Sequence, residues 1–220
     1  MAEKYSGKVM DRRYKGDAVD ITYSLKRCIH AEQCIHNLSA VFDKNRRPWI
    51  ITGAASADEV ARVVPLCPSG ALHFEGKNGS TESIPEVNRI LLWEHGPLQV
   101  HGEVEVSGST VELQGETRAT LCRCGGSANK PFCDNAHLTN DFQAPDVTME
   151  WGEETNRAGG KLHITVEANG PYLVSGEVTI INAAGAVIFS GSEVWLCRCG
   201  GSSNKPFCDS THERIGFQAE

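Results

Sequence analysis

A segment with three cysteines and one histidine occurs twice in this chain, at residues 121–137 and again at residues 196–212. Both copies read Leu-Cys-Arg-Cys-Gly-Gly-Ser-x-Asn-Lys-Pro-Phe-Cys-Asp-x-x-His, and they differ from each other only at the x positions. Three sulfurs and one imidazole at a fixed spacing, present twice, predict two metal centres. The candidate ligands are Cys122, Cys124, Cys133 and His137 in the first copy and Cys197, Cys199, Cys208 and His212 in the second.

The spacing of these ligands suits a compact site. Cys122 and Cys124 follow an apolar stretch, and residues two apart on an extended backbone point to the same side. Cys133 and His137 are four residues apart, so they share one side of a helical turn if Asp134 caps a helix that begins there. We expect the same local structure in the second copy.

Ser127 and Ser202 occupy the same place in the two copies, between the ligands. Hydroxyl and backbone N–H donors at these positions are expected to hydrogen-bond to thiolate or sulfide and so to tune the metal. The ligand set itself fits a structural zinc ion as well as an iron–sulfur cluster. All four ligands of a copy fall within 16 residues, whereas zinc sites usually combine two ligand pairs that are separated by a longer loop. This difference slightly favours an iron–sulfur cluster.

Both segments resemble the CDGSH-type iron–sulfur family, the mitoNEET-like proteins, whose motif is Cys-x-Cys-x2-Ser/Thr-x3-Pro-x-Cys-Asp-Gly-x-His. They match this motif at every ligand and at its serine, proline and aspartate. The family's glycine is replaced by Asn135 and Ser210, and asparagine adopts a left-handed backbone more readily than serine does. The resemblance implies one 2Fe–2S cluster in each motif, held by three cysteines and one histidine.

Three of the nine cysteines lie outside the two copies, and they are Cys28, Cys34 and Cys67. A disulfide framework is not expected, because the number of cysteines is odd and the polar amino terminus shows no export signal. Cys28 and Cys34 are close in sequence, and Cys67 stands far from them in a Cys-Pro pair. These three thiols therefore predict a third metal centre.

The segments around these three cysteines predict a small α/β unit. Residues 21–25 alternate between apolar and polar side chains, as a strand does. Ser56 and Glu59 are spaced as a capping box at the start of a short helix, which Pro65 should end. A final strand is expected at residues 71–74.

This plan resembles bacterial-type single-cluster ferredoxins over residues 18–75. Those proteins carry Cys-x2-Cys-x2-Cys and a distant Cys-Pro, whereas the middle position here is Ala31. The resemblance implies a 3Fe–4S cluster on three thiolates, because the missing iron is the one that the middle cysteine binds. The segment also resembles a divergent single-cluster domain that binds 4Fe–4S, and His30 or His36 then completes the ligand set. The remaining alternative is three buried, inert thiols.

We expect an α+β chain with a small ferredoxin-like domain at residues 1–83 and two β-rich CDGSH-type modules at residues 84–145 and 146–220. Alternating apolar residues predict strands before each motif, at 98–106 and 172–180. Polar stretches at 76–84 and 150–160 are typical of linkers. Proteins of the family with one motif per chain pair as homodimers, so two motifs in one chain imply a monomer that is an intramolecular pseudo-dimer.

The net charge of -7 and the pI near 5.6 argue against non-specific binding to nucleic acid, which needs a basic surface. No stretch approaches the roughly 20 apolar residues of a membrane span, so we expect a soluble, cytoplasmic protein that binds no membrane. No phosphate-binding loop, nucleophile elbow or acid–base pair stands out, and an enzyme is not predicted.

Three redox-capable modules favour an electron-transfer protein that exchanges single electrons with an unidentified redox partner. A releasable histidine ligand favours a second hypothesis, in which the chain stores, senses or delivers clusters to an apo-acceptor protein. The third hypothesis is a zinc-stabilised interaction module.

Overall fold

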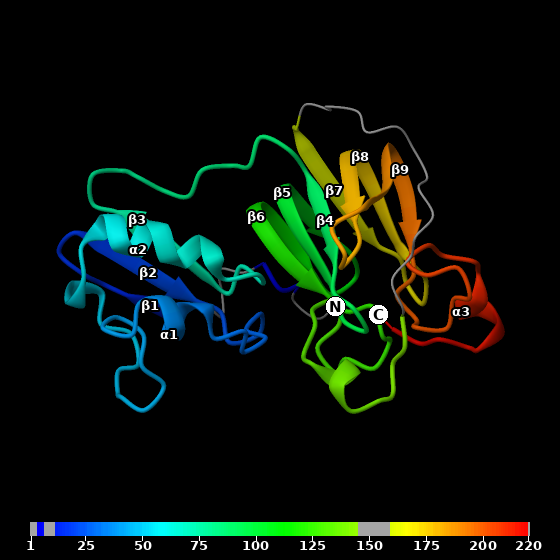
Figure 1. Cartoon of the computed structure of the whole chain (residues 1–220), viewed down its shortest axis with the longest axis horizontal. Helices are drawn as coiled ribbons and strands as arrows, with labels where there is room; N and C mark the ends of the chain where they lie inside the picture. Colours follow the sequence, from blue (N-terminus) through cyan, green and yellow to red (C-terminus); the bar gives the residue numbers. More distant parts are fainter. Residues whose placement is uncertain (1–3, 7–11, 145–158, 220) are drawn as a thin grey trace. The chain divides into compact units, whose positions relative to one another are not determined.

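The computed structural model describes residues 4–6, 12–144 and 159–219. The chain forms two compact units, residues 7–83 and residues 84–220 with 1–6 (Figure 1). The linker expected at residues 150–160 lies outside the described residues as far as residue 158. Among the residues that are described, no helix has both the length and the apolar character that a membrane span requires.

The amino-terminal unit is built on a three-stranded antiparallel sheet in the order β1-β2-β3 (Figure 1). Its strands are β1 (Arg12–Tyr14), β2 (Val19–Tyr23) and β3 (Leu72–Gly76). The chain between β2 and β3 forms α1 (Gln33–Asn37), η1 (Thr52–Ala54), α2 (Ala57–Val63) and η2 (Val64–Leu66). A small core joins the sheet to these helices and includes the fully buried Ile21, Phe42 and Val60.

The predicted capping box starts α2. The backbone N–H of Glu59 donates to Ser56 Oγ at 3.3 Å, and the Glu59 carboxylate accepts from the Ser56 N–H at 2.9 Å, which confirms the prediction. The α-helix ends at Val63, and Pro65 lies in the following 3-10 turn, which leads directly to Cys67. The last strand runs slightly further than predicted, to Gly76.

The carboxy-terminal unit contains two modules that share one six-stranded sheet. The first module has β4 (Arg89–Leu92), β5 (Leu98–Ser107), β6 (Glu112–Leu121) and the 3-10 turn η3 (Ala136–Leu138). The second has β7 (Lys161–Val166), β8 (Tyr172–Ile181), β9 (Val187–Leu196) and α3 (Thr211–Arg214). The strands predicted at 98–106 and 172–180 are thus confirmed as β5 and β8. The fold is β-rich with few helices, which is consistent with the expected α+β class.

The two modules exchange strands in a reciprocal pattern. Within each module the strands pair antiparallel, but β4 also pairs parallel with β8, and β7 pairs parallel with β5. Asn88 joins the two halves, because its Nδ2 donates to the carbonyls of Gly160 and Glu177 at 2.9 Å and its Oδ1 accepts from the Glu103 N–H at 3.2 Å. Neither module completes its part of the sheet alone.

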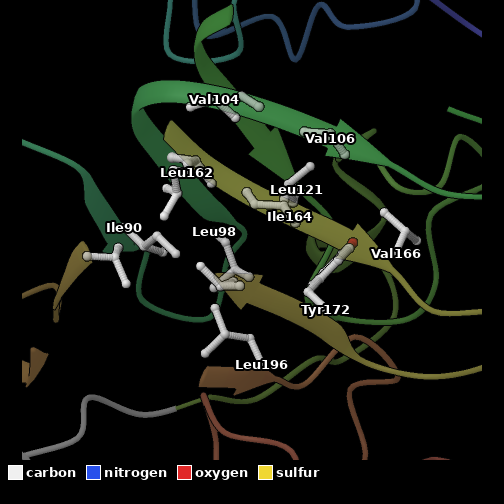
Figure 2. Close-up of a cluster of buried hydrophobic side chains, with 14 of the residues drawn as sticks. Ile90, Leu98, Val104, Val106, Leu121, Leu162, Ile164, Val166, Tyr172 and Leu196 are labelled. Carbon is white, nitrogen blue, oxygen red and sulfur yellow. The ribbon is translucent and has the colours of Figure 1, made fainter. Parts of the chain in front are cut away.

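All six strands contribute side chains to one apolar core (Figure 2). Val104 from β5, Ile164 from β7 and Leu196 from β9 all belong to it, each with at most 1% of its surface exposed (Figure 2). Burying an aliphatic side chain of this size stabilises the fold by about 1.5–3 kcal/mol. The ends of β6 and β9, which lead into the two cysteine segments, are anchored in this core by Leu121 and Leu196.

Candidate metal centres

The first repeated segment brings its four candidate ligands together as two pairs. Cys122 and Cys124 leave the end of β6 with their sulfurs 3.7 Å apart. Cys133 Sγ lies 3.6 Å from Nδ1 of His137 in η3. Cys122 and Cys133 are buried, and Cys124 and His137 are partly exposed.

The second segment repeats this arrangement. The sulfurs of Cys197 and Cys199 are 3.8 Å apart, and Cys208 Sγ lies 3.5 Å from Nδ1 of His212. His212 belongs to α3, and 14% of its side chain is exposed. The two segments therefore present the same donors in the same geometry.

Within each pair, the distance fits two ligands that bind the same tetrahedral metal ion. Two sulfurs bound at roughly 2.3 Å lie about 3.7 Å apart, and a sulfur and an imidazole nitrogen lie about 3.6 Å apart. Across the part of the chain that the structure describes, no three Cys, His, Asp or Glu side chains gather as ligands of one ion. Each segment thus offers two donor pairs, which is the arrangement that two irons with two protein ligands each require.

The backbone of each segment is folded back on its own strand. The Cys122 N–H donates to Pro131 O at 2.8 Å, and the Cys133 N–H donates to Thr120 O at 3.0 Å. The second segment has the equivalent bonds, from Cys197 to Pro206 at 2.7 Å and from Cys208 to Trp195 at 2.9 Å. In each segment, these bonds hold the first cysteine, at the end of the strand, close to the third cysteine, which precedes the helical turn.

The serine hydroxyls hold the loops, and it is the backbone N–H groups of Ser127 and Ser202 that hydrogen-bond to the sulfurs of Cys122 and Cys197. Ser127 Oγ donates to Phe132 O, and Ser202 Oγ donates to Phe207 O, both at 2.7 Å. The sulfurs instead receive backbone donors, as sequence reasoning also allowed.

In the first segment the N–H groups of Gly126 and Asn135 lie 3.4 and 3.3 Å from the sulfurs of Cys124 and Cys133. Asn135 and Ser210 both adopt the left-handed backbone, with φ of 69° and 60°, so the turn forms with either residue in the place of the family's glycine.

Asp134 is not the residue that caps the turn before His137. That position is Asn135, which makes no side-chain cap. The Asp134 carboxylate instead accepts from the N–H groups of Ala128 at 2.8 Å and Ala136 at 3.0 Å, and so it ties the two arms of the loop together. Asp209 does the same with Ser203 and Thr211, and these hydrogen bonds hold its pKa well below the usual range.

Arg123 and Arg198, which stand between the paired cysteines, are buried rather than solvated. Arg123 donates to the carbonyls of Trp93 at 2.7 Å and Gly96 at 2.9 Å. Arg198 donates to Glu167 O at 2.7 Å. A buried cation beside the ligands offsets negative charge there, because the low dielectric of the interior strengthens their interaction.

The two cysteine loops touch each other across the modules. Cys124 and Cys199 form an isolated antiparallel bridge. A side chain at Gly125 would overlap Cys199 O, and one at Gly200 would overlap Cys124 O. The two candidate centres are therefore built on adjoining backbone.

Burial favours the protonated form of Cys133 and Cys197, whereas Cys124 loses its proton more readily than a free thiol. Burial raises the pKa of Cys133 to about 11 and that of Cys197 to about 11. The hydrogen bond between Cys122 and Cys124 raises the pKa of Cys122 and lowers that of Cys124 to about 5. Burial also lowers the pKa of His137, which favours the neutral imidazole that a metal requires.

The three amino-terminal cysteines line one small cavity of about 30 Å³. Cys28 follows β2, Cys34 lies in α1 and Cys67 follows η2. Burial raises the pKa of Cys28 and raises that of Cys34 to about 12. Three convergent thiols fit the donor set of a cluster better than that of scattered inert cysteines.

Ala31 also lines this cavity, at the position where a fourth thiolate would stand. Its neighbours His30 and Glu32 both have left-handed backbone, with φ of 54° and 55°, and this curls the segment around the cavity. His30 belongs to the lining. His36 is not among the described lining residues, and its side chain is 70% exposed beside Glu32 at 3.5 Å. Of the two histidines considered as ligands, only His30 is therefore placed to reach the cavity.

Sequence reasoning missed Tyr172, which supports the first loop from the second module. Its hydroxyl lies 2.9 Å from Cys122 O and 3.0 Å from Pro131 O. No local motif marks this residue, because the equivalent position in the first module is Leu98.

Comparisons with known proteins match separate parts of the chain. The family described as a divergent 4Fe-4S mono-cluster matches residues 14–77, and the family described as an iron-binding zinc finger of CDGSH type matches residues 95–138 and 169–213. The uncharacterized protein YjdI of Escherichia coli K12 is 32% identical over 66 residues, which are 30% of this chain and 87% of YjdI, and the YjdI of strain O157:H7 matches equally.

The fold and the sites are thus those of an iron–sulfur cluster-binding protein. This chain belongs to the CDGSH-type iron-binding family through its two modules and to the divergent 4Fe-4S mono-cluster family through its amino-terminal unit.

Proposed function

We propose that this chain is an electron-transfer protein with two 2Fe–2S clusters in the repeated modules and one 3Fe–4S cluster in the amino-terminal unit. Bound iron–sulfur clusters accept and release single electrons. The chain's own part is to supply the ligands, to exclude water from them and to set the charge around them. The partner is a redox protein that the sequence does not identify.

The paired ligands carry this proposal. Donor pairs 3.5–3.8 Å apart in both segments support two irons with two protein ligands each. A single zinc ion would need all four donors around one point. His137 and His212 each replace a thiolate by a neutral imidazole, which removes one negative charge and raises the reduction potential relative to four cysteines.

The three-iron assignment rests on the amino-terminal cavity. Cys28, Cys34 and Cys67 supply three thiolates there, and Ala31 supplies none. If His30 acts as a fourth ligand, the cavity suits a 4Fe–4S cluster instead.

The reciprocal strand exchange supports a pseudo-dimer within one chain. β4 and β7 each pair with both β5 and β8, so the halves are related as two subunits of a twofold dimer are. We accordingly propose that the protein acts as a monomer.

Iron and acid-labile sulfide counted per chain test the cluster assignment. We expect seven irons, from three in the amino-terminal unit and two in each module. Eight irons point to a 4Fe–4S cluster, and four point to an amino-terminal cavity without one. Colourless protein that holds zinc without sulfide contradicts the whole proposal.

Stopped-flow reduction tests the electron-transfer role. Reduction of the full-length protein by a limiting amount of dithionite should be followed by exchange of electrons between the amino-terminal cluster and the other two. Clusters that are all present but never exchange electrons contradict this role and leave the cluster assignment intact.

The position of the two histidines favours cluster delivery as a second candidate. His137 and His212 are carried on single helical turns at partly exposed places, whereas Cys122 and Cys197 are buried at strand ends. Delivery predicts that iron and sulfide pass to an apo-ferredoxin. Replacing both histidines by cysteine should then suppress this transfer, since thiolate ligands are not released by mild acid.

A further inference from the structure

A larger recess adjoins the amino-terminal cysteine cavity. It has a volume of about 470 Å³ and is open to solvent. Cys28, Cys34, Tyr23 and Trp49 belong to the walls of both spaces. The recess therefore gives access to one side of the proposed cluster, and no function described above uses it.

Aromatic side chains form much of this recess. Tyr14, Tyr23 and Trp49 line it. The rings of Tyr23 and Trp49 meet edge to face with centroids 4.8 Å apart, and Phe42 lies 6.0 Å from Trp49 on the core side, so the indole is held in place. Clefts lined by aromatic side chains with a few polar groups are typical small-molecule sites.

Two guanidinium groups give the recess a positive charge. Arg12 in β1 is registered opposite Tyr23 in β2, which places both side chains on one face of the sheet. Arg47 is oriented by its own loop, because its Nη1 donates to Lys44 O at 3.0 Å and to Arg46 O at 2.7 Å.

The other charged residues in the recess largely cancel. Glu32 and Lys44 also line it and form an ion pair of 2.6 Å. The unit that holds the recess has 11 Lys and Arg against 9 Asp and Glu, whereas the rest of the chain has 10 against 19. Positive charge in an aromatic recess complements a ligand that has both a ring and an acid group.

We propose that this recess binds a small aromatic anion, with its ring against Trp49 and its carboxylate, sulfonate or phosphate on Arg12 and Arg47. The site lies beside Cys28 and Cys34, so a bound ligand would adjoin the cluster that these cysteines hold. The presence of that cluster rests on the proposed function. A negative charge beside the cluster opposes the arrival of an electron. By reciprocity, reduction of the cluster weakens binding of the anion.

Binding of two matched dyes to the oxidised full-length holoprotein tests this site. The probes are 8-anilinonaphthalene-1-sulfonate and N-phenyl-1-naphthylamine, which have the same rings with and without the acid group, and equilibrium dialysis measures both. We expect the sulfonate to bind at least about tenfold more tightly, because a charge-assisted pair with guanidinium adds to ring contact. Reduction of the protein with dithionite should weaken the binding of the sulfonate and leave the binding of the uncharged dye unchanged.

Variants locate the binding. The double change Arg12→Gln and Arg47→Gln should lower affinity for the sulfonate about tenfold and leave the uncharged dye unchanged. Trp49→Leu should lower the affinity for both dyes. Arg62→Gln, which removes a cation of α2 that does not line the recess, is the matched control and should change neither.

Equal affinity for the two dyes, or no loss of sulfonate affinity in the double variant, overturns the proposal. A double variant that shifts only the reduction potential of the cluster also overturns it, because the arginines then serve the cluster alone. Preparations without the amino-terminal cluster separate the two claims. Arginine-dependent sulfonate binding that persists there supports the site even if the proposed function fails.

Discussion

The hydroxyl of Tyr172 lies 2.9 Å from the carbonyl oxygen of Cys122, so a strand of the second module supports the cysteine loop of the first. The same hydroxyl is 3.0 Å from Pro131 O, where that loop returns to its strand. Tyr172 is fully buried, and Leu98 takes the equivalent place in the first module. The two centres therefore have the same ligands but unequal support.

Tyr172→Phe should loosen the first loop selectively. Loss of the hydroxyl leaves buried carbonyl groups without this donor, which costs about 1–3 kcal/mol. Hydrogen exchange measured by mass spectrometry should rise in residues 121–137 and stay unchanged in residues 196–212. Tyr14→Phe, in the other unit, is the control and should alter neither segment. Equal loosening of both segments would show that Tyr172 supports the sheet rather than the loop.

Lysine–phenylalanine contacts cross between the modules in both directions. Lys130 lies over the ring of Phe217 at 6.0 Å, and Lys205 lies over the ring of Phe142 at 5.9 Å. Each lysine also donates to a serine carbonyl of its own cysteine loop at 2.6 Å. The segment after each motif thus contacts the loop of the other motif.

Phe217→Leu should therefore increase the mobility of the first loop, although the residue belongs to the second module. Loss of a cation–π contact of this kind costs about 0.5–1 kcal/mol. The mirror change, Phe142→Leu, is the matched control and should act on the second loop. Release of iron to a chelator, followed with hydrogen exchange in each loop, checks the pattern. Effects confined to the mutated module would contradict it.

The sequence predicted that the paired candidate ligands lie close together, but it did not predict what surrounds them. The spacing of Cys133 and His137 is local, and two residues four apart on a helical turn meet whatever the rest of the chain does. The capping box of Ser56 and Glu59 is local in the same sense. The family match supports the iron–sulfur prediction at both ends of the chain.

What the sequence did not show depends on contacts between distant segments. The burial of Arg123 depends on the carbonyls of Trp93 and Gly96, some 30 residues earlier, which no local pattern marks. The support from Tyr172 depends on the exchange of strands between modules. The Ser127 hydroxyl was expected to donate to sulfur, but it donates to Phe132 O in its own loop. Local patterns carry no information on such choices.

His137→Cys should lower the reduction potential of the first centre. It should also slow the loss of the cluster from this centre at mildly acidic pH. A thiolate adds one negative charge, and comparison of cluster types places the effect on the order of 100–300 mV. Redox titration followed by electron paramagnetic resonance measures the potential. His212→Cys is the matched change in the second centre and should leave the first potential nearly unchanged. An unchanged potential in both variants would show that these histidines are not ligands.

Asp20 predicts how the amino-terminal unit responds to acid. Hydrogen bonds from Lys77 Nζ at 2.7 Å and from the Gly16 N–H at 3.1 Å lower the pKa of Asp20 from 3.8 to about 2. A carboxylate whose pKa is lower in the folded state contributes stability above its unfolded pKa and loses it as the pH falls through the folded value. The contribution of Asp20 should be complete at neutral pH and disappear between about pH 4 and pH 2.

Asp20→Asn should accordingly destabilise the unit at pH 7, and the difference from the natural chain should shrink as the pH falls from about 4 to 2. Urea unfolding of the metal-free chain measures this, with the fluorescence of Trp49 as the signal after the other three tryptophans are changed to phenylalanine. Asp17→Asn, at an exposed position, is the control. A difference that stays constant down to pH 2 would mean that Asp20 acts through its shape and hydrogen bonds, not through its charge.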